Sequence, residues 1–367
     1  MRRLLALSLA LLAAGAPTAQ PTAGGAATPL YTGAERPPAQ VSLSTLYQRV
    51  EGDGVELSQL SVPLGLFLPI TRDLGFSLNA YYAASDGPDM AGVDGFADAQ
   101  AALSYRVPVG AGSAVLSVGV NAPGGGAALT AEKAETAFLI GQGFYAFRLP
   151  TLGQGFNVAP GVTYAVPVGE RVVLGVGVLY QVRGPFEPRA EIDDAYDPGD
   201  EVLLTGGADV QIAPGASLAL DVTYIGYGTD EWVGQSYQTG DAVAVTARWA
   251  QAVGPHEVVV LGRVRRKAET EVPPETAAFL AADAAVPTQG RVLASARLRL
   301  SPAVRLGVAA QGRYYDASDV FSEKALVDLL LTPEVAVSRG AALVGRLGGT
   351  LGDIQGLEAG AGVVVRF

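Results

Sequence analysis

Residues 216–224 read Ala-Ser-Leu-Ala-Leu-Asp-Val-Thr-Tyr, with an apolar or aromatic residue at every second position. Successive side chains of a β-strand point to opposite faces, so Leu218 and Leu220 lie on one face. Asp221 and Thr223 lie on the other. The stretch therefore predicts a strand that separates an apolar environment from a more polar one.

The same alternation recurs from about residue 41 to the end of the chain, in segments of about ten residues. Short connections rich in turn residues alternate with longer polar ones. The short connections are Pro69-Ile70-Thr71-Arg72, Val109-Gly110-Ala111-Gly112, Val168-Gly169-Glu170, Pro214-Gly215, Gly254-Pro255, Ser301-Pro302 and Ser338-Arg339-Gly340. The longer ones are residues 85–97, 123–153, 185–200, 228–240, 268–288 and 316–327.

This asymmetry predicts an all-β transmembrane antiparallel barrel of about 16 strands, with about 12 or 14 left open. Short turns are expected on the periplasmic side and long loops on the extracellular side. A soluble β-sandwich shows the same alternation along its strands, but it lacks the regular exchange of short turns and long loops.

Composition agrees with a protein that hides much apolar surface. The chain is 49% hydrophobic, its mean hydropathy is +0.28, and it has no cysteine for a disulfide or a lipid anchor. Past the N-terminal region, no apolar run approaches the roughly 18 residues of a membrane-spanning helix. A net charge of −11 argues against a nucleic-acid partner, which requires an exposed basic face.

The N-terminal residues predict export. Met1-Arg2-Arg3 precedes an apolar run from Leu4 to Ala14, and small residues follow through Ala19. This is the pattern of a secretory signal peptide. We therefore expect a signal peptide over residues 1–19, a disordered lead rich in Ala, Thr, Pro and Gly over residues 20–40, and a barrel over residues 41–367.

The last strand adds a second signal. One face carries Leu357, Ala359, Ala361, Val363, Val365 and Phe367. Here the sequence resembles the bacterial outer-membrane β-barrel superfamily, whose final strand ends in an aromatic residue preceded by alternating apolar residues. The resemblance implies the bacterial outer membrane, with its lipid and lipopolysaccharide as partners. It also implies that Val363, Val365 and Phe367 are recognised by the barrel-assembly machinery; an ordinary buried last strand is the alternative.

A narrower resemblance rests on three short motifs, Gly153-Gln154-Gly155-Phe156, Pro160-Gly161-Val162-Thr163-Tyr164 and Gly175-Val176-Gly177-Val178-Leu179-Tyr180. These motifs and their order resemble segments of outer-membrane transporters for aromatic hydrocarbons and long-chain fatty acids. The N-terminal plug motif of the fatty-acid transporters has no match in residues 20–40, so their plugged, lateral-release mechanism is not implied here.

Strand parity directs a set of arginines inward, because an arginine facing lipid would cost about 2–4 kcal/mol near the bilayer midplane. The set is Arg263, Arg265, Arg291, Arg297, Arg299, Arg305 and Arg313. These residues either form an electropositive wall that selects anions or carboxylate-bearing solutes, or they pair across the lumen with acidic residues. The acidic candidates are Asp209, Asp221, Glu257 and Glu334.

One predicted loop is unusually apolar. Its clusters are Phe138, Leu139 and Ile140, then Phe144, Tyr145 and Phe147. Exposed apolar patches mark interaction sites, so we expect the loop to fold inward as a constriction or to cap the mouth and capture an apolar solute. An additional membrane-embedded strand is the alternative.

Metal and catalytic sites have weaker support. Asp193, Asp194, Asp197 and Asp200 cluster in one loop, but their spacing is not that of a calcium loop, and a solvated acidic loop is the simpler interpretation. The single histidine, His256, argues against histidine-based hydrolysis and histidine-rich metal sites. We expect no cofactor and no enzymatic activity.

The sequence thus predicts an outer-membrane channel or transporter for small solutes, possible classes being hydrophobic and anionic compounds. A barrel of structural, receptor or adhesion type without pore activity is the alternative.

Overall fold

The computed structural model describes residues 38–149, 153–268, 288–318 and 321–367. The predicted signal peptide and most of the predicted lead lie outside these residues. Within them, no helix has the length and the apolarity that crossing a membrane requires.

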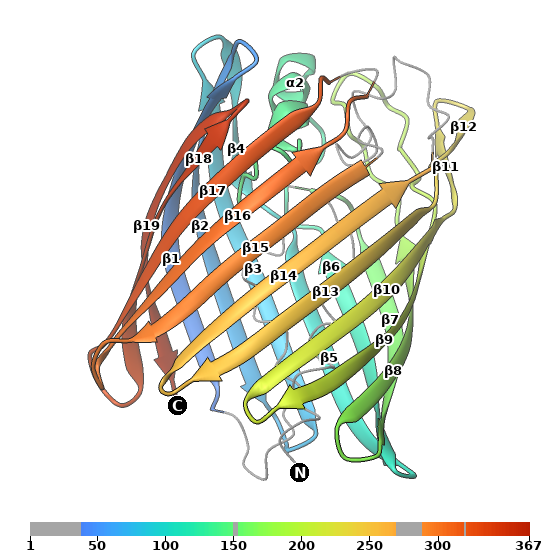
Figure 1. Cartoon of the computed structure of the whole chain (residues 1–367). Coiled ribbons are helices and arrows are strands. Elements are labelled where there is room, and N and C mark those ends of the chain that lie inside the picture. Colours follow the sequence, from blue (N-terminus) through green and yellow to red (C-terminus); the bar gives the residue numbers. More distant parts are fainter. Residues whose placement is uncertain (1–37, 150–152, 269–287, 319–320) are drawn as a thin grey trace.

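Antiparallel strands dominate the described residues and form one closed wall, in which β4 continues the line of β5 (Figure 1). The wall consists of β1 (Gln40–Gly52), β2 (Val55–Pro69), β3 (Leu74–Gly87), β4 (Met90–Phe96), β5 (Ala99–Val109), β6 (Gly112–Ala122), β7 (Asn157–Val168), β8 (Val172–Arg183), β9 (Glu201–Ala213), β10 (Ala216–Tyr227), β13 (Ala242–Val253), β14 (His256–Lys267), β15 (Thr288–Arg299), β16 (Val304–Tyr315), β17 (Lys324–Ala336), β18 (Ala341–Gly352) and β19 (Gln355–Arg366). Outside it lie helix α2 (Ala131–Ile140) and the hairpin of β11 (Thr229–Trp232) and β12 (Gln235–Gln238). With β4 and β5 counted together, the barrel has 16 strands, which confirms the sequence prediction.

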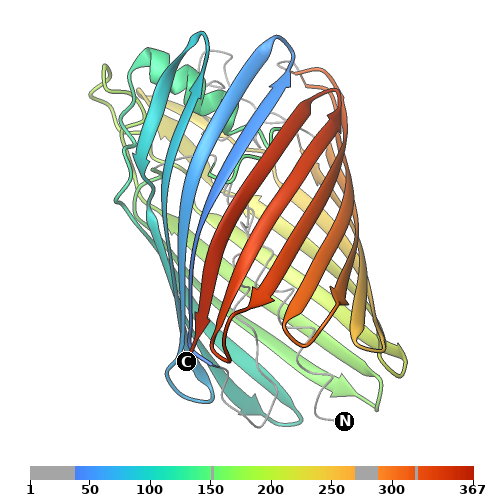
Figure 2. The same ribbon diagram turned by 90° about the vertical axis from the view of Figure 1, so that its left-hand side faces the viewer.

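The first and last strands close the barrel. β1 pairs with β2 on one side and with β19 on the other, from Gln40↔Arg366 to Glu51↔Gln355 (Figure 2). Beyond this ladder, Ala39 and Phe367 exchange two backbone hydrogen bonds of 2.9 and 3.0 Å. The wall therefore has no free edge, as a β-structure in lipid requires.

The outer face of the wall is apolar. In β10, Leu218, Leu220 and Val222 are 43%, 51% and 45% exposed, whereas the inward Ala219 and Thr223 are 5% and 8% exposed. A 12-residue strand such as β10 spans about 40 Å at about 3.4 Å per residue. A tilt of about 40° reduces this to about 30 Å along the axis, the thickness of a bilayer core.

The connections separate by length, as predicted. One end of the barrel, which we call the turn end, carries only short turns, together with Phe367; α2 and the long connections lie at the other, the loop end, where two-residue turns also join β1 to β2, β3 to β4 and β18 to β19 (Figure 1). One boundary prediction was wrong. Residues 85–97 are mostly strand, because β3 and β4 extend beyond the neighbouring wall and pair with each other.

A bulge interrupts the wall between β4 and β5. Pairing with β3 shifts from Asn79↔Gln100 to Tyr82↔Phe96, and the Ala97 N–H donates to the Tyr81 carbonyl at 2.9 Å. The additional residue reverses the alternation between β4 and β5, so Ala97 and Asp98 both lie inside the barrel, where they are 5% and 1% exposed.

The seam between β1 and β19 depends on small inward residues. A Cβ added at Gly362 would lie 2.5 Å from the Ser44 Cβ and 2.6 Å from the Leu43 carbonyl oxygen. We expect Gly362→Ala to destabilise the folded barrel by about 1–3 kcal/mol, because overpacking shifts the backbone of the seam. Urea unfolding in lipid vesicles measures the change.

Gly312→Ala is the matched control for this substitution. Gly312 lies on β16, and no described atom lies within 4 Å of an added Cβ. We expect it to be neutral, or stabilising by up to about 1 kcal/mol, because alanine restricts the unfolded strand. Equal effects of the two substitutions would show that the seam tolerates a larger residue.

Candidate functional site

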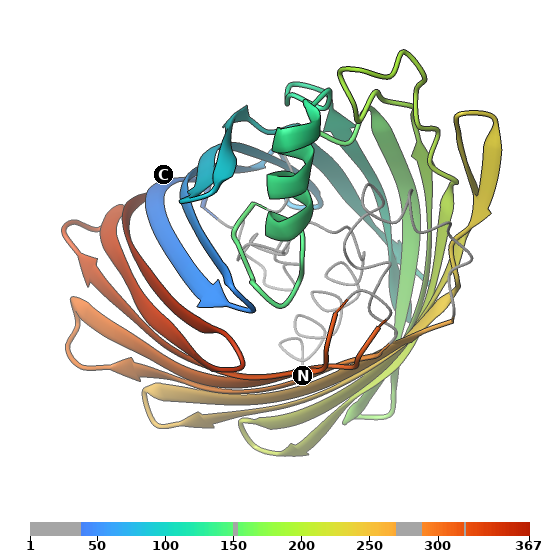
Figure 3. The ribbon, with the colours of Figure 1, turned by 90° about the horizontal axis from the view of Figure 1, so that it is seen from above.

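The connection between β6 and β7, described over residues 123–149 and 153–156, folds into the barrel, and we call these residues the inserted loop. Its helix α2 begins after Thr130, whose hydroxyl caps the Lys133 N–H. The Thr136 hydroxyl donates to the Ala91 carbonyl on β4 at 2.8 Å. Seen from the loop end, α2 and the chain after it lie within the ring of strands, towards β1 to β4 (Figure 3).

Two facing glutamines hold the inserted loop against β1 and β2. Gln48 donates to the Ala146 carbonyl at 3.1 Å and accepts from the Arg148 N–H at 2.7 Å. Gln59, its register partner, donates to the Leu149 carbonyl at 2.7 Å and accepts from the Leu149 N–H at 2.9 Å. The two amides thus satisfy backbone groups that would otherwise be buried without a partner.

Arg313 and Tyr315 also hold the loop, from β16, four strands along the wall from β1. Arg313, with a side chain 5% exposed, donates from Nε and Nη2 to Asp328 at 2.6 and 2.7 Å. Its Nη1 donates to the Phe144 carbonyl at 2.8 Å, and the Tyr315 hydroxyl donates to the Gly143 carbonyl at 2.9 Å. The predicted lumen arginine Arg313 is therefore an anchor of the loop.

The apolar residues of the inserted loop are used in its own packing. Phe144, Tyr145 and Phe147 are 1%, 4% and 2% exposed, and the ring of Phe144 contacts Tyr315 and Phe321 edge-on at centroid distances of 5.9 and 5.1 Å. Burial, reinforced by the charge of Asp53, raises the pKa of Tyr145 to about 12, so the side chain is neutral at ordinary pH.

The other apolar candidates lie on α2. Ile140 is 4% exposed and Leu139 packs against the same cluster, while Phe138 stacks on Phe321 at 5.8 Å. A helix and coil occupy this segment, so the alternative of an additional membrane strand was wrong. Because little of this apolar surface is exposed, the inward fold of the loop favours its role as a constriction of the lumen over capture of an apolar solute at the mouth.

One carboxylate fastens both ends of the inserted loop. Asp98, which lies inside the barrel beside the bulge, accepts from the backbone N–H groups of Gly124 and Gly125 at 3.1 and 3.0 Å. It also accepts from the Gln154 N–H at 2.7 Å and from the Asn121 side chain at 2.8 Å. The beginning and the end of the loop thus share one acceptor.

All seven predicted arginines lie on the inward face. Arg291 is the register partner of both Arg263 and Arg313, and the alternate residues Val264, Val292 and Val308 are 54%, 59% and 37% exposed on the outer face. Arg299 faces Arg305 in the next pair of strands.

The seven arginines differ in their surroundings. Arg265 and Arg313 are each 6% exposed. The side chains of Arg297 and Arg305 are 70% and 49% exposed, although they lie 3.5 and 3.4 Å from Glu257 and Glu334. Arg291 and Arg299 are also exposed.

These ion pairs join adjacent strands and do not cross the lumen. The other two acidic candidates lie among different neighbours. On β9 and β13, Asp209 and Arg248 flank the same residue of β10, Ala219.

The acidic loop residues are engaged separately. Asp200 accepts from the Tyr180 hydroxyl at 2.5 Å and from the Arg183 N–H at 3.0 Å. Asp197 exchanges backbone hydrogen bonds with Glu231, and the Asp194 carbonyl accepts from Trp232. Among the described residues, no group of three or more His, Cys, Asp or Glu side chains could hold a metal ion, Asp193 included.

Two further candidates lie at the turn end. His256 begins β14, and its Nδ1 accepts from the Arg299 N–H at 3.2 Å. Val365 and Phe367 are 39% and 72% exposed, and Val363 shares their face. Recognition of this strand by the assembly machinery remains a prediction.

The sequence analysis missed the residues that hold the inserted loop. Gln48 had a visible signal, since it stands between two buried apolar residues of the inward face, Leu46 and Val50. Asp98 also had one, since it continues the inward face of Gln100 and Ala102 on β5, two residues before Gln100. Arg148 and Asp328 depend on contacts between segments far apart in the sequence.

Comparison with solved structures shows the fold. OprB from Pseudomonas putida is 9% identical with a TM-score of 0.50, covering 90% of this chain and 94% of that chain. An outer-membrane channel from Pseudomonas putida F1 is 12% identical (TM-score 0.42; 91% and 97% covered), and OpdQ from Pseudomonas aeruginosa is 11% identical (TM-score 0.44; 91% and 99% covered). No protein-family model matches the chain. No curated protein matches it either.

The closed wall, its apolar outer face and its short turns together make the chain a bacterial outer-membrane β-barrel. By the general arrangement of such barrels, the turn end faces the periplasm and the loop end faces the cell exterior.

Removing the two glutamines should release the inserted loop. Gln48→Ala with Gln59→Ala removes the four side-chain hydrogen bonds to the inserted loop, each contributing about 1 kcal/mol. We expect larger and noisier single-channel currents in a planar bilayer. Gln211→Ala, on β9, is the control; the same conductance in the double variant and the wild type would show that this contact does not set the constriction.

Removing the shared carboxylate should loosen both ends of the loop. We expect Asp98→Ala to expose the inserted loop to trypsin at Lys133 and Arg148, because three backbone N–H groups lose their acceptor. Mass spectrometry of the fragments measures cleavage. Asp73→Ala, which removes an ion pair with Arg106 in a turn, is the control; if cleavage in the loop is no faster in Asp98→Ala than in this control, Asp98 is not the fastener.

Proposed function

We propose that this chain is a diffusion channel for small solutes, narrowed within the membrane by the inserted loop. The observation that carries this proposal is how the loop is held. Wall side chains from two separate parts of the barrel, Gln48 and Gln59 on β1 and β2, and Arg313 and Tyr315 on β16, bind its backbone. Such a fixed loop leaves a defined passage whose lining decides what crosses.

The passage prefers anions in this proposal. Arg291, Arg297, Arg299 and Arg305 present exposed guanidinium groups on the inner faces of β15 and β16. Because the wall has a low dielectric constant, their field is concentrated in the water of the lumen. The neighbouring Glu257 and Glu334 reduce this field without matching the number of arginines.

One observation favours the alternative of a barrel without pore activity. Ile140, Phe144 and Phe147 of the inserted loop pack with Leu326 and Ile354 of the wall into an apolar cluster at the loop end. An apolar cluster of this kind resembles the core of a plug. Steady conductance separates the two functions, since a plugged barrel carries none.

The outer surface suggests the partners of the barrel. Near the loop end, Tyr47, Tyr180, Tyr224 and Tyr314 are between 39% and 46% exposed on the outer face, as in the aromatic girdles that meet lipid and lipopolysaccharide head groups. At the turn end, the outward Val363, Val365 and Phe367 form the strand that we propose the assembly machinery recognises.

The four exposed arginines allow a direct test of the proposed anion preference. We expect the refolded protein to conduct steadily and to prefer anions. The anion-to-cation permeability ratio should move closer to unity when Arg291, Arg297, Arg299 and Arg305 are all changed to Ala. Reversal potentials in a salt gradient measure it, and the effect should weaken at high salt because charges are screened.

Arg266→Ala is the control for this test, because Arg266 lies on β14 with its side chain on the outer face, opposite Val243. It should leave the reversal potential unchanged. A folded wild-type barrel with no conductance would contradict the channel; conductance with an unchanged reversal potential in the fourfold variant would contradict the role of the arginines.

A further inference from the structure

Three arginines occupy adjacent inward positions at the turn end of the barrel. Arg297 and Arg299 lie at the end of β15, and Arg305 lies at the beginning of β16. In the strand register Arg299 is paired with Arg305, and Arg297 is paired with Gly307, which has no side chain. Three guanidinium groups therefore surround one position of the inner wall that carries no side chain of its own.

Two glutamates flank this group, one on each side, without neutralising it. Glu257 on β14 lies 3.5 Å from Arg297. Glu334 on β17 lies 3.4 Å from Arg305, but it also lies 3.8 Å from Arg366 on β19. With Arg299 included, four arginines face two glutamates, so the turn end has an excess of two positive charges on this part of its inner rim.

The turn between β15 and β16 fixes Arg299 opposite Arg305. The Ser301 N–H donates to the Val304 carbonyl at 3.1 Å, and the Val304 N–H donates to the Ser301 hydroxyl at 3.0 Å. The backbone N–H of Arg299 donates to Nδ1 of His256 on β14 at 3.2 Å. Two like charges are thus held directly opposite each other on a β-ladder, an arrangement that destabilises the pair unless an anion lies between them.

The donors of this group are open to a solute. The side chain of Arg299 is exposed, and it forms no ion pair or hydrogen bond with any residue in the described part of the chain. The Thr332 hydroxyl lies over Gly307 and adds a neutral donor. A guanidinium group presents its N–H groups in a planar fork that matches two oxygens of an oxyanion.

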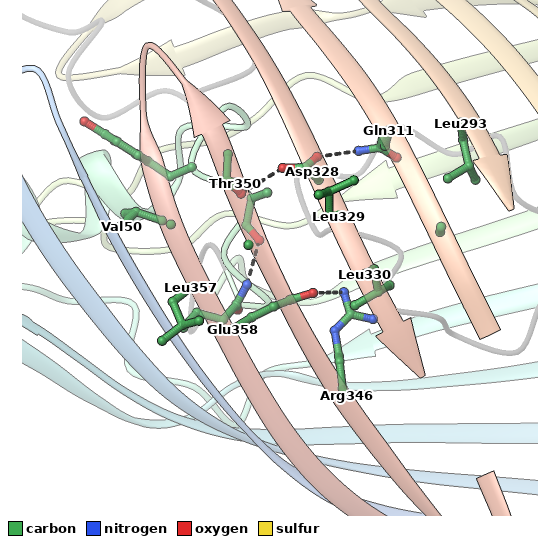
Figure 4. A pocket seen from close by; sticks show the side chains of 16 residues that line it. Val50, Leu293, Gln311, Asp328, Leu329, Leu330, Arg346, Thr350, Leu357 and Glu358 are labelled. Carbon is green, nitrogen blue, oxygen red and sulfur yellow. Dashed lines mark hydrogen bonds and ion pairs between the residues drawn. The ribbon is translucent and has the colours of Figure 1, made fainter. Parts of the chain in front are cut away.

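Two other inward arginines of this side of the wall each have a carboxylate of their own. Arg313 is buried against Asp328. Arg346 on β18 pairs with Glu358 on β19 at 2.9 Å, beside a cavity of about 160 Å³ between the inserted loop and the wall (Figure 4). At the turn end, by contrast, the arginines outnumber the carboxylates.

We propose that Arg297, Arg299 and Arg305 form a binding site for a small, freely dissolved oxyanion that carries two negative charges. The anion lies over Gly307 and accepts hydrogen bonds from the three guanidinium groups. Its two charges balance the excess of two positive charges. This inference deepens the proposed channel function and rests on it, because it gives a solute that crosses the lumen a specific site at the periplasmic mouth.

Sulfate is a suitable probe because it keeps both negative charges over the whole neutral pH range. Titrated calorimetrically into the refolded protein in detergent micelles, it should bind saturably. Methanesulfonate has three of the same oxygens and a single charge, so it should bind about tenfold more weakly or worse, having lost one charge-assisted interaction. Equal affinities for the two anions would overturn a site built for two charges.

Arg299→Gln and Arg305→Gln, made separately, should each raise the dissociation constant of sulfate about tenfold, because each removes a charge-assisted hydrogen bond. Arg291→Gln is the matched control. Arg291 is also an exposed inward arginine of β15, but it lies eight residues from Arg299, about 26 Å at about 3.3 Å per residue. This exceeds the Debye length of about 10 Å at an ionic strength of about 0.1 M, so the constant should not change. The same change in all three variants would mean that sulfate senses only the total charge of the lumen, and it would overturn the site.

Glu334→Gln tests the site in a way that misfolding cannot imitate. The substitution removes the carboxylate that Arg305 and Arg366 share, so the positive excess at the turn end rises. Sulfate should then bind several times more tightly. Unchanged or weaker binding by the folded variant would contradict the assigned role of Arg305.

Conductance separates this inference from the proposed function. The calorimetric titration does not require an open lumen, because the arginines lie at the turn end. A barrel that conducts KCl and binds no sulfate overturns the site and leaves the channel standing. A barrel that binds sulfate through Arg299 and Arg305 but carries no current supports the site and contradicts the channel.

Discussion

Lipid offers the backbone no hydrogen bonds, and the rest of this structure depends on that constraint. A β-structure satisfies it only by joining its first and last strands, and β1 and β19 do so along their whole length, with Ala39 and Phe367 extending the ladder. Closure requires close backbone approach at the seam, which the absence of a side chain at Gly362 permits. Closure also encloses a space, and the alternation of strand side chains makes its lining more polar than the outside.

That enclosed polar lining explains how a long connection can lie inside the barrel. A chain entering the lumen brings carbonyl and N–H groups that need partners, and the inward side chains of Gln48, Gln59 and Arg313 supply them. Apolar side chains of the loop then pack around Phe144. Asp98 restrains the loop where it leaves and rejoins the wall. The passage is thus shaped by side-chain to backbone bonds, and the same polar lining supplies the charges that act on a solute.

The inward arginines show how one sequence pattern leads to different physical roles. Parity directs all of them to the lumen because lipid excludes them. Depth and neighbours then separate them: Arg313 is buried on Asp328 and holds the loop, while Arg297 and Arg305 stay exposed beside single carboxylates. Arg346 on β18 pairs with Glu358 on β19 at 2.9 Å. A count of lumen arginines therefore overstates the number available to a solute.

The sequence by itself determined the architecture, because period-two alternation and the exchange of short turns with long connections are local properties that each segment carries independently. From these followed the barrel, its strand number, the outward face of Leu218 and Leu220, and the inward face of each arginine. It also marked the apolar loop from Phe138 to Phe147 as unusual. Only the tertiary structure decided where that loop lies and which residues hold it. Gln48 and Ala146, or Arg313 and Phe144, are far apart in the chain, and Asp98 is distant in sequence from both ends of the loop that it binds, so these contacts exist only once the barrel has closed.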